Sequence, residues 1–430
     1  MFEKLLILFY YLKTKYFMHF SSREQLDRWQ QKRLRKFLDY IIPRSPFYHS
    51  LYRKTDSRNK LTPINKAIFM ENFDNLNTVG ISLKEALEVA QLAEDSRNFS
   101  PTCKGYTVGL SSGTSGIRGV FLVSRLERAK WCGTILAKML PRGLFSVTKI
   151  AFFLRADSNL YETIHSSFLK FKFFDLKEDF SLHVGSLQSF QPNVLVAPPT
   201  VLDLLSKKQQ QGEISLTLEK IISVADVLYD DIKQRVQNSF HLPVHQIYQA
   251  TEGLLGCSCK EGNLHLNEDL IHIEKKVLDE KNHKFIPIIT DFNRTTQPII
   301  AYELNDILTE DPTPCPCGSP MIRLKQIEGR ADDILCFKDD NGKEKLIFPD
   351  FIIRLILRVC PMIGEFKVVQ EGSFLHIFAS ISDVKRQELE AHLQSFFSEN
   401  RLTVKCVFMP FSQKIPLTMK NKRVIRSISK

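Results

Sequence analysis

The chain has 430 residues, of which 43% are hydrophobic and 25% charged, and its formal net charge is +11. This composition is that of a folded globular protein and excludes a largely disordered chain, and the length suits two or three domains. The lysines and arginines are scattered along the sequence, which is typical of a solvated surface. This distribution disfavours nucleic acid as a partner, while the positive net charge is compatible with binding phosphate-rich molecules.

The first twenty residues predict a helix. Its apolar run, residues 5–12, is too short to span a bilayer, and no small-residue cleavage site follows it. We expect this helix to pack on its own domain, although its aromatic and basic residues also suit weak contact with a membrane surface. No other stretch is long and apolar enough to span a membrane, so the expected location is the cytoplasm.

Helical and strand patterns then alternate along the chain. Helical spacing covers residues 22–60 with a stop at Pro43 and Pro46, and mixed helix follows over 64–98. Further helices are expected at 126–140, 200–211 and 385–397, and buried strands at 149–154, 193–196, 220–224 and 244–248. The alternation predicts an α/β fold with largely parallel sheets, and the last 98 or so residues suffice for a small α+β domain.

Residues 110–119 read LSSGTSGIRG, a loop rich in hydroxyl groups and glycine. Gly113 and Gly116 allow positive φ and a close approach of the backbone to a ligand, and successive N–H groups and hydroxyls can surround an anion. An apolar run typical of a strand follows at 120–123. The stretch predicts a phosphate-binding loop, with a Ser/Gly surface turn as the alternative; no lysine follows Gly116, which excludes a P-loop of the GxxxxGK type.

Four more segments follow this loop in a recognisable order: YQATEG (248–253), PIIAYELND (298–306), EGRADDIL (328–335) and PLTMKNKRVIR (416–426). With residues 29–52, they make the chain resemble the adenylate-forming enzymes, the acyl-CoA synthetase superfamily, and most closely the phenylacetate–CoA ligase branch. The resemblance implies a large N-terminal adenylation domain of several subdomains over 1–329, a hinge at 330–332 and a small mobile C-terminal α+β domain over 333–430.

This family activates a carboxylic acid with Mg²⁺ and ATP, releases pyrophosphate, and passes the acyl group to a thiol. The resemblance therefore implies ATP, Mg²⁺ and either coenzyme A or the phosphopantetheine of an acyl carrier protein. The C-terminal domain would alternate between two orientations about Asp332. Transfer to an amine or hydroxyl acceptor is the alternative among enzymes, and a non-catalytic, zinc-stabilised nucleotide-binding or interaction protein is the alternative from another class.

The resemblance also assigns roles to individual residues. Thr251 would contact the α-phosphate, Glu252 would help to bind Mg²⁺, and Lys422 would be the catalytic lysine that bridges the acid and the α-phosphate. The other nucleotide-binding candidates are Ser111, Ser112, Gly113, Thr114, Ser115 and Gly116 at the β- and γ-phosphates, Tyr248 near the adenine, Asp306 and Arg330 at the ribose, and Asp332 at the hinge. Each of these residues also has an ordinary structural explanation when it is taken alone. Residues 251–252 could begin a helix, Asp306 could lie in a turn, and Lys422 could be a charge exposed to solvent.

The chain departs from the family pattern at several positions. Gly119 stands where many members have lysine, and Arg118 where they have proline. Ala301 and Glu303 occupy positions where the branch commonly has arginines, and Asn421 replaces a glycine, although asparagine tolerates the left-handed conformation. These differences concern activity more than fold.

Four of the nine cysteines form two C-x-C pairs, Cys257/Cys259 and Cys315/Cys317. In a chain with no export signal, paired cysteines indicate a metal site sooner than disulfides. Related phenylacetate–CoA ligase-like proteins have a similar Cys…His…Cys-x-Cys arrangement. It implies a structural zinc held by Cys257 or Cys259 with His265, Cys315 and Cys317. A four-cysteine site and metal-free reduced thiols are the alternatives.

The acid itself is only partly indicated. We expect its pocket to draw on residues 151–157, 197–200 and 223–227, and Phe152, Phe153 and Ala225 favour an aromatic or apolar acid.

Overall fold

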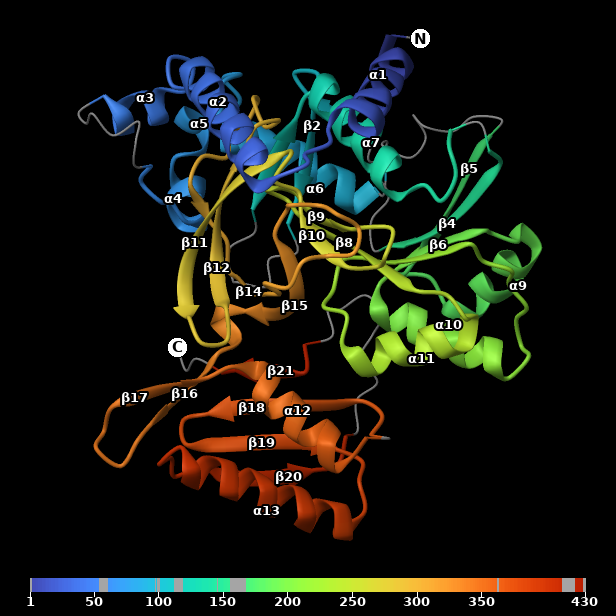
Figure 1. Ribbon diagram of the computed structural model, residues 1–430, viewed down its shortest axis with the longest axis vertical. Helices are drawn as coiled ribbons and strands as arrows, with labels where there is room; N and C mark the ends of the chain where they lie inside the picture. Colours follow the sequence, from blue (N-terminus) through green and yellow to red (C-terminus); the bar gives the residue numbers. More distant parts are fainter. Residues whose placement is uncertain are drawn as a thin grey trace. The chain divides into compact units, whose positions relative to one another are not determined.

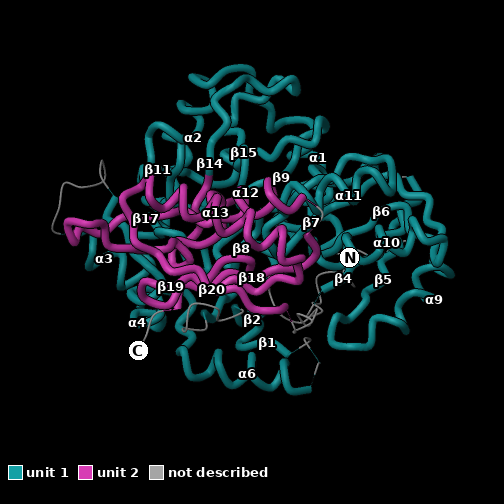
Figure 2. Tube along the Cα trace, turned by 90° about the horizontal axis from the view of Figure 1, so that it is seen from below, with its two compact units in different colours: residues 1–304, 309–326 teal, residues 305–308, 327–430 magenta. Residues whose placement is uncertain are grey.

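The computed structural model describes residues 2–53, 61–96, 98, 101–111, 119–144, 146–154, 168–361, 363–411 and 422–427. The chain forms two compact units, shown in different colours in Figure 2. Unit 1 comprises Met1–Leu304 and Thr309–Gln326, and unit 2 comprises Asn305–Leu308 and Ile327–Lys430. None of the described helices is both long and apolar enough to cross a bilayer.

Unit 1 begins with a run of helices: α1 (Phe2–Phe17), α2 (Arg23–Ile41), α3 (Pro46–Tyr52), α4 (Lys66–Glu71), α5 (Phe73–Leu76) and α6 (Leu83–Ser96). The stop expected at Pro43 and Pro46 is confirmed, because α2 ends before Pro43 and α3 takes Pro46 in its first turn. The hydroxyls of Ser22 and Ser45 accept hydrogen bonds from the first turns of α2 and α3, which satisfies otherwise unpaired N–H groups.

A small antiparallel sheet follows, with strands β1 (Thr102–Cys103), β2 (Tyr106–Leu110) and β3 (Val120–Val123). The loop predicted to bind phosphate joins β2 to β3. Helix α7 (Arg125–Met139) comes next, and its capping box pairs Ser124 with Glu127. Glu127 also accepts hydrogen bonds from the backbone N–H groups of Thr295 and Thr296, so α7 is fixed to a segment distant in the sequence.

The main sheet has twelve strands, and its parallel part has the order β5-β4-β6-β7-β8. These strands are β4 (Thr148–Leu154), β5 (Leu169–Asp175), β6 (Val194–Ala197), β7 (Lys220–Ser223) and β8 (Val244–Ala250). Helices α1 and α7 pack on one face, and α9 (Phe180–Phe190), α10 (Pro199–Gln210) and α11 (Asp230–Phe240) lie on the other (Figure 1). The buried strands are apolar on both faces, as parallel strands require.

The rest of the main sheet is largely antiparallel and continues the edge at β8. It contains β9 (Gly253–Ser258), β10 (Leu264–Leu266), β11 (Ile271–Asp279), β12 (Lys284–Asp291), β13 (Tyr302–Glu303), β14 (Asp306–Glu310) and β15 (Arg323–Arg330). This region is the strand-rich part expected beyond residue 263.

Unit 2 has its own sheet, in the order β20-β19-β18-β21. Its elements are the short 3-10 helix η2 (Ala331–Asp333), strands β16 (Leu335–Lys338), β17 (Glu344–Ile347), β18 (Phe366–Glu371), β19 (Phe374–Ala379), β20 (Lys405–Met409) and β21 (Val424–Arg426), and helices α12 (Pro349–Val359) and α13 (Asp383–Glu399). The predicted α/β class with a smaller α+β unit is confirmed.

Candidate functional site

The base of the predicted phosphate loop is closed by hydrogen bonds between its two ends. The backbone N–H of Ser111 donates to the carbonyl of Gly119 over 2.8 Å, and the Gly119 N–H donates to Ser111 Oγ over 2.6 Å. Strands β2 and β3 pair in antiparallel register directly outside this closure. The candidates Ser112, Gly113, Thr114, Ser115 and Gly116 lie outside the described residues.

A lysine that the sequence motifs did not indicate lies at this loop base. Lys66, the first residue of α4, places its Nζ 3.3 Å from Ser111 Oγ. A Cβ added at Gly119 would lie 3.2 Å from Lys66 Cε and 3.2 Å from Ser111 Oγ. A cation therefore stands beside the loop although residue 119 is not a lysine. Lys66 and Ser111 are 45 positions apart in the sequence, which leaves no spacing signal that could have revealed the contact.

The Thr251–Glu252 pair lies in the tight turn between antiparallel strands β8 and β9, so the helix N-terminus that these residues also suited is wrong. Thr251 Oγ1 donates to Glu252 Oε2 over 2.9 Å. Tyr248, on β8, is buried. Gly253 leaves room for a buried carboxylate, because a Cβ there would lie 2.6 Å from Asp291 Oδ2 and would displace it. The turn thus presents a hydroxyl and a carboxylate together.

The carboxyl ends of β6, β7 and β8 share one edge, where open α/β sheets usually bind ligands. Ala197, Ser223 and Gln246 are aligned across these strands. Ser223 Oγ is buried and has no hydrogen-bond partner among the described residues, and Ala225 adopts a φ of 71°. A buried unpaired hydroxyl beside a strained residue is typical of a functional site. The expected acid pocket includes this edge, while its residues 155–157 lie outside the described part.

Within unit 2, the segments around Asp306 and Arg330 lie together. Asp306 begins β14, and Arg330 ends β15 directly before η2. The backbone N–H of Ala331 donates to the carbonyl of Asn305 over 2.9 Å, and the Asn305 side-chain amide donates to the Asp332 carboxylate. Two acids and one arginine predicted from separate motifs are therefore neighbours in this unit.

Lys422 pairs with an acid that the motif assignment left out. Its Nζ lies 2.9 Å from Oδ1 and 2.8 Å from Oδ2 of Asp333, and the side chains are 24% and 9% exposed. Burial raises the pKa of Asp333, and the ammonium of Lys422 opposes that shift. Lys422 is therefore not a solvated terminal charge. The second aspartate of the EGRADDIL segment was the available signal for this partner.

The two C-x-C pairs contribute to one compact group. One ligand atom from each of Cys259, His265, Cys315 and Cys317 lies within 4.8 Å of the others. Cys259 Sγ is 3.9 Å from Cys315 Sγ, and Cys317 Sγ is 3.6 Å from His265 Nε2. Burial disfavours ionisation of Cys315, but hydrogen bonds from the Cys317 backbone and from His265 lower its pKa to about 6. Such an environment favours a thiolate, the form that binds metals.

Cys257 is not part of this group, which corrects its place among the ligand candidates. It lies within β9 and packs in a hydrophobic cluster with Leu136 and Leu254, while Asn267 Nδ2 approaches its Sγ to 3.7 Å. Burial raises the pKa of its thiol. Cys259 lies one residue beyond the strand, in the turn toward β10, and so faces a different environment.

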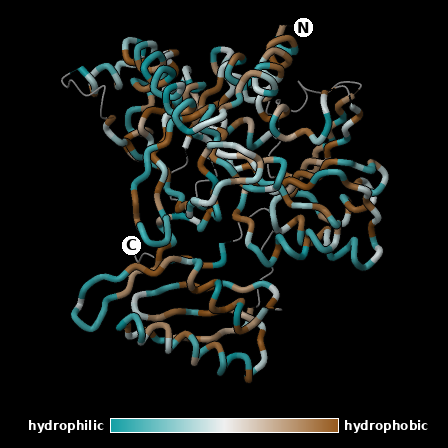
Figure 3. Tube along the Cα trace, viewed as in Figure 1, coloured by the Kyte–Doolittle hydropathy of each residue, from teal (hydrophilic) through white to brown (hydrophobic). Residues whose placement is uncertain are grey.

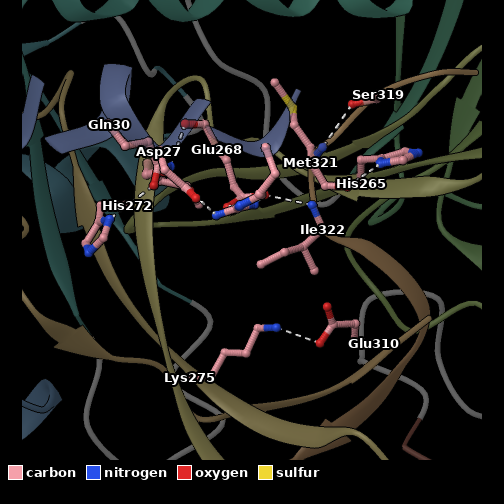
Figure 4. A network of polar contacts seen from close by, with 12 residues as sticks. Asp27, Gln30, His265, Glu268, His272, Lys275, Glu310, Ser319, Met321 and Ile322 are labelled. Atoms are coloured by element: carbon pink, nitrogen blue, oxygen red, sulfur yellow. Dashed lines mark hydrogen bonds and ion pairs between the residues drawn. The ribbon is translucent and has the colours of Figure 1, made fainter. Parts of the chain in front are cut away.

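A polar network holds the segment beside the cysteine and histidine group (Figure 4). His265 Nδ1 donates to the Met321 carbonyl over 3.1 Å, which leaves Nε2 toward the cysteines. The next residue, Ile322, donates its N–H to the buried carboxylate of Glu268 over 2.7 Å. Arg23 of α2 forms an ion pair with Glu268 at 2.7 Å. The histidine is thus oriented by a backbone contact, as is common around metal ligands.

Ala301 and Glu303, which differ from the family pattern, each make specific contacts in the structure. Ala301 is 1% exposed with a φ of 46°, and its N–H donates to Thr290 Oγ1. Glu303 forms an ion pair with Lys276 at 2.8 Å. At this position, where the family pattern has an arginine, the chain therefore has an acid that is paired with a lysine.

The chain matches no family model. Among curated proteins it is 28% identical to Protein CapK of Staphylococcus aureus over 162 residues, which cover 37% of this chain and 36% of that protein. It is 22% identical to a phenylacetate-coenzyme A ligase of Thermus thermophilus over 205 residues, 44% of each chain. The matched segments therefore span less than half of these relatives.

Solved structures match over much more of the chain. A 2-hydroxyisobutyryl-CoA ligase in the postadenylation state, in complex with 2-HIB-AMP, aligns with a TM-score of 0.68 and 16% identity over 95% of this chain and 91% of that one. The amide bond synthetase McbA of Marinactinospora thermotolerans aligns with a TM-score of 0.54 and 11% identity over 75% and 69%. The chain therefore has the fold of these two enzymes, and its resemblance to a phenylacetate–CoA ligase is confirmed over the matched part of the chain.

Proposed function

We propose that this protein activates a carboxylic acid with ATP and transfers the acyl group to a thiol. In the first step a carboxylate oxygen forms a bond to the α-phosphorus, and the bond from that phosphorus to pyrophosphate breaks. In the second step the thiol sulfur attacks the acyl carbon and AMP leaves. The observation that carries this proposal is the fold match over 95% of the chain to a CoA ligase complexed with an acyl-adenylate.

The residues of unit 1 suit the demands of the first step, in which negative charge is spread over phosphoryl oxygens. Ser111 and the loop residues after it would donate to the β- and γ-phosphates, and Lys66 would add a cation there. Thr251 would donate to the α-phosphate, and Glu252 would hold Mg²⁺, a hard cation that prefers oxygen ligands. Mg²⁺, when bound, neutralises phosphate charge.

The residues of unit 2 suit the nucleoside and the reacting carboxylate. Asp306 can accept hydrogen bonds from two ribose hydroxyls, and Arg330 lies beside it in the fold. Lys422 would bridge the acid and the α-phosphate after leaving Asp333. Rotation about Asp332 would then admit the thiol of coenzyme A or of a carrier-protein phosphopantetheine. Tyr248 of unit 1 would line the adenine.

We further propose a structural Zn²⁺ at Cys259, His265, Cys315 and Cys317. Three sulfurs and one imidazole nitrogen are the donor set that Zn²⁺ takes in closed tetrahedral sites. Such an ion would join the β9–β10 turn to the loop before β15. Because four protein ligands leave no open position, its contribution would be to stability rather than to the reaction.

An amine is an alternative to the thiol as the acceptor of the acyl group, and one of the structural matches favours it. McbA is an amide bond synthetase, so the same fold also occurs in a protein named for forming amides. An amine acceptor would use the same adenylate and differ only in the second step. A chain that binds ATP but never releases pyrophosphate would instead be a non-catalytic nucleotide-binding protein.

Acid-dependent release of pyrophosphate from Mg·ATP, measured over a panel of aryl and fatty acids, tests the proposal. We expect release with one class of acid, and we expect Lys422→Ala to lower its rate about 100-fold or more, since it removes a charge placed at the reacting phosphate. Lys420→Ala tests the alignment of the motif, because a larger loss in that variant would move the catalytic role to residue 420. Binding of ATP without release for any acid would contradict the proposal.

A further inference from the structure

Helix α1 carries an apolar stripe that faces solvent. Phe2, Leu5, Phe9, Leu12 and Tyr16 are 76%, 58%, 56%, 42% and 64% exposed. They are spaced alternately three and four residues apart, so they follow one face of the helix. Seven of the nineteen exposed large hydrophobic side chains in the described part of the chain lie on α1, so this is a concentrated patch and not ordinary scatter.

The opposite face fixes the helix to unit 1. Ile7 and Tyr11 are buried in the cluster that includes Ala129 and Cys132 of α7. Gly133 allows the two helices to approach closely, because a Cβ there would lie 2.5 Å from the Ile7 carbonyl oxygen. Figure 3 shows much of α1 in the hydrophobic colour. The exposed stripe is therefore held in a fixed direction.

Cations border the stripe. Lys4, Lys13 and Lys15 are exposed on α1, and on a helical wheel Lys4 and Lys15 fall on one side of the stripe and Lys13 on the other. The single acid of the helix, Glu3, forms an ion pair with Arg128 at 2.6 Å, so its charge is compensated. Burial lowers the pKa of Lys13, and the nearby guanidinium of Arg33 lowers it further.

This charge pattern favours an anionic surface over a second copy of the chain as the partner of the stripe. Alternating spacing of three and four also suits a coiled coil between two copies. In such a pair the flanking positions are occupied by Lys13 and Lys15, with no acid on either flank, so like charges would face each other. An anionic surface meets the same lysines favourably. Lysine stems can also lie along the apolar stripe while their ammonium groups reach outward.

We propose that α1 docks the protein on the surface of an anionic lipid bilayer. The stripe would lie at the boundary between headgroups and acyl chains, where aromatic side chains are favoured, and the lysines would contact anionic headgroups. The helix would lie in the plane of the membrane without crossing it. This proposal does not depend on the reaction that the protein catalyses.

Vesicle co-sedimentation of the full chain tests the proposal. The probes are vesicles of phosphatidylcholine alone and vesicles with equal parts of phosphatidylcholine and phosphatidylserine, each at low and high salt. We expect binding to the anionic vesicles that weakens at high salt. The double variant Phe9→Ser/Leu12→Ser should weaken binding about tenfold or more, because it removes two side chains from the inserted stripe.

A matched control replaces exposed leucines elsewhere in unit 1. Leu92 on α6 and Leu182 on α9 are 59% and 68% exposed, and Leu92→Ser/Leu182→Ser should bind as the unchanged protein does. Lys13→Glu/Lys15→Glu should abolish the preference for anionic vesicles. No binding by the unchanged protein, or equal binding by the stripe and control variants, would overturn the proposal. A concentration-dependent dimer lost in Phe9→Ser/Leu12→Ser, without vesicle binding, would assign the stripe to a second copy instead.

Discussion

At the scale of single residues, Asp291 is a buried carboxyl close to the candidate turn. It is 4% exposed, its Oδ1 accepts the N–H of Asn293 over 2.7 Å, and its Oδ2 lies against Gly253. Burial raises its pKa from 3.8 to about 6, although Arg294 and Lys130 oppose the shift. The folded state therefore holds this proton more tightly than the unfolded state does.

The pKa shift predicts a pH dependence of stability. The contribution of Asp291 is fully present below its unfolded pKa of 3.8 and is lost as the pH rises through about 6. At about 1.4 kcal/mol per unit of pKa, the loss is on the order of 3 kcal/mol. In urea unfolding at several pH values across this window, Asp291→Asn should remove this slope, whereas the exposed Asp340→Asn should retain it. Equal slopes in all three proteins would contradict the assignment.

At the scale of elements, the contact between α1 and α7 depends on one glycine. A Cβ at Gly133 would lie 2.5 Å from the Ile7 carbonyl oxygen and 2.8 Å from Tyr11 N, both backbone atoms that cannot move alone. Gly133→Ala should therefore lower the free energy of unfolding by about 1–3 kcal/mol, as overpacking does. Gly185 on α9 has no atom within 4 Å of such a Cβ, so Gly185→Ala should be neutral or stabilising.

Thermal unfolding of both variants measures this difference, and hydrogen exchange reports whether α1 separates locally. Faster exchange confined to α1 in Gly133→Ala is the expected result. If both glycine variants had the same stability, the close contact between the two helices would be wrong.

The cysteines give a second prediction at this scale. We expect about one zinc per chain by atomic emission, and we expect Cys259→Ser to lose it, because a tetrahedral site needs all four ligands. Cys257→Ser should keep the metal, since Cys257 lies in the hydrophobic core. Chelation should lower the melting temperature of the unchanged protein and of Cys257→Ser. If Cys259→Ser retained zinc, or if only Cys257→Ser lost it, Cys257 would be the zinc ligand in place of Cys259.

At the scale of the whole molecule, the proposed second step needs the two units to change orientation. Asp332 lies in η2, between β15 and the sheet of unit 2. Proline fixes φ near −65° and removes an N–H, so Asp332→Pro restricts rotation at this position. We expect it to change the rates of pyrophosphate release and thioester formation by factors that differ about tenfold or more, because the two half-reactions need different orientations.

Asp332→Ala is the control, since it removes the carboxylate but leaves φ free. If proline and alanine lowered both half-reactions by the same factor, the carboxylate would matter and rotation at residue 332 would not. Assays of each half-reaction with the same preparation separate these outcomes.

Local features of the fold could be predicted because they depend on neighbours in the sequence. Prolines 43 and 46 predicted the break between α2 and α3, and the alternation of strands and helices predicted the parallel part of the sheet. The turn at Thr251 and Glu252 could not be distinguished from a helix start, because both use the same residue types. Only the pairing of β8 with β9 separates the two.

The sequence by itself therefore determined the fold class, the order of the motifs and the candidate residues within each motif. Tertiary structure alone decided which distant residues meet: Lys66 with Ser111, Asp333 with Lys422, and Cys259 rather than Cys257 with His265. The physical reason is that periodicity and turn chemistry act over a few residues. Contacts across a folded core depend on how whole elements pack, and spacing along the chain does not record that packing.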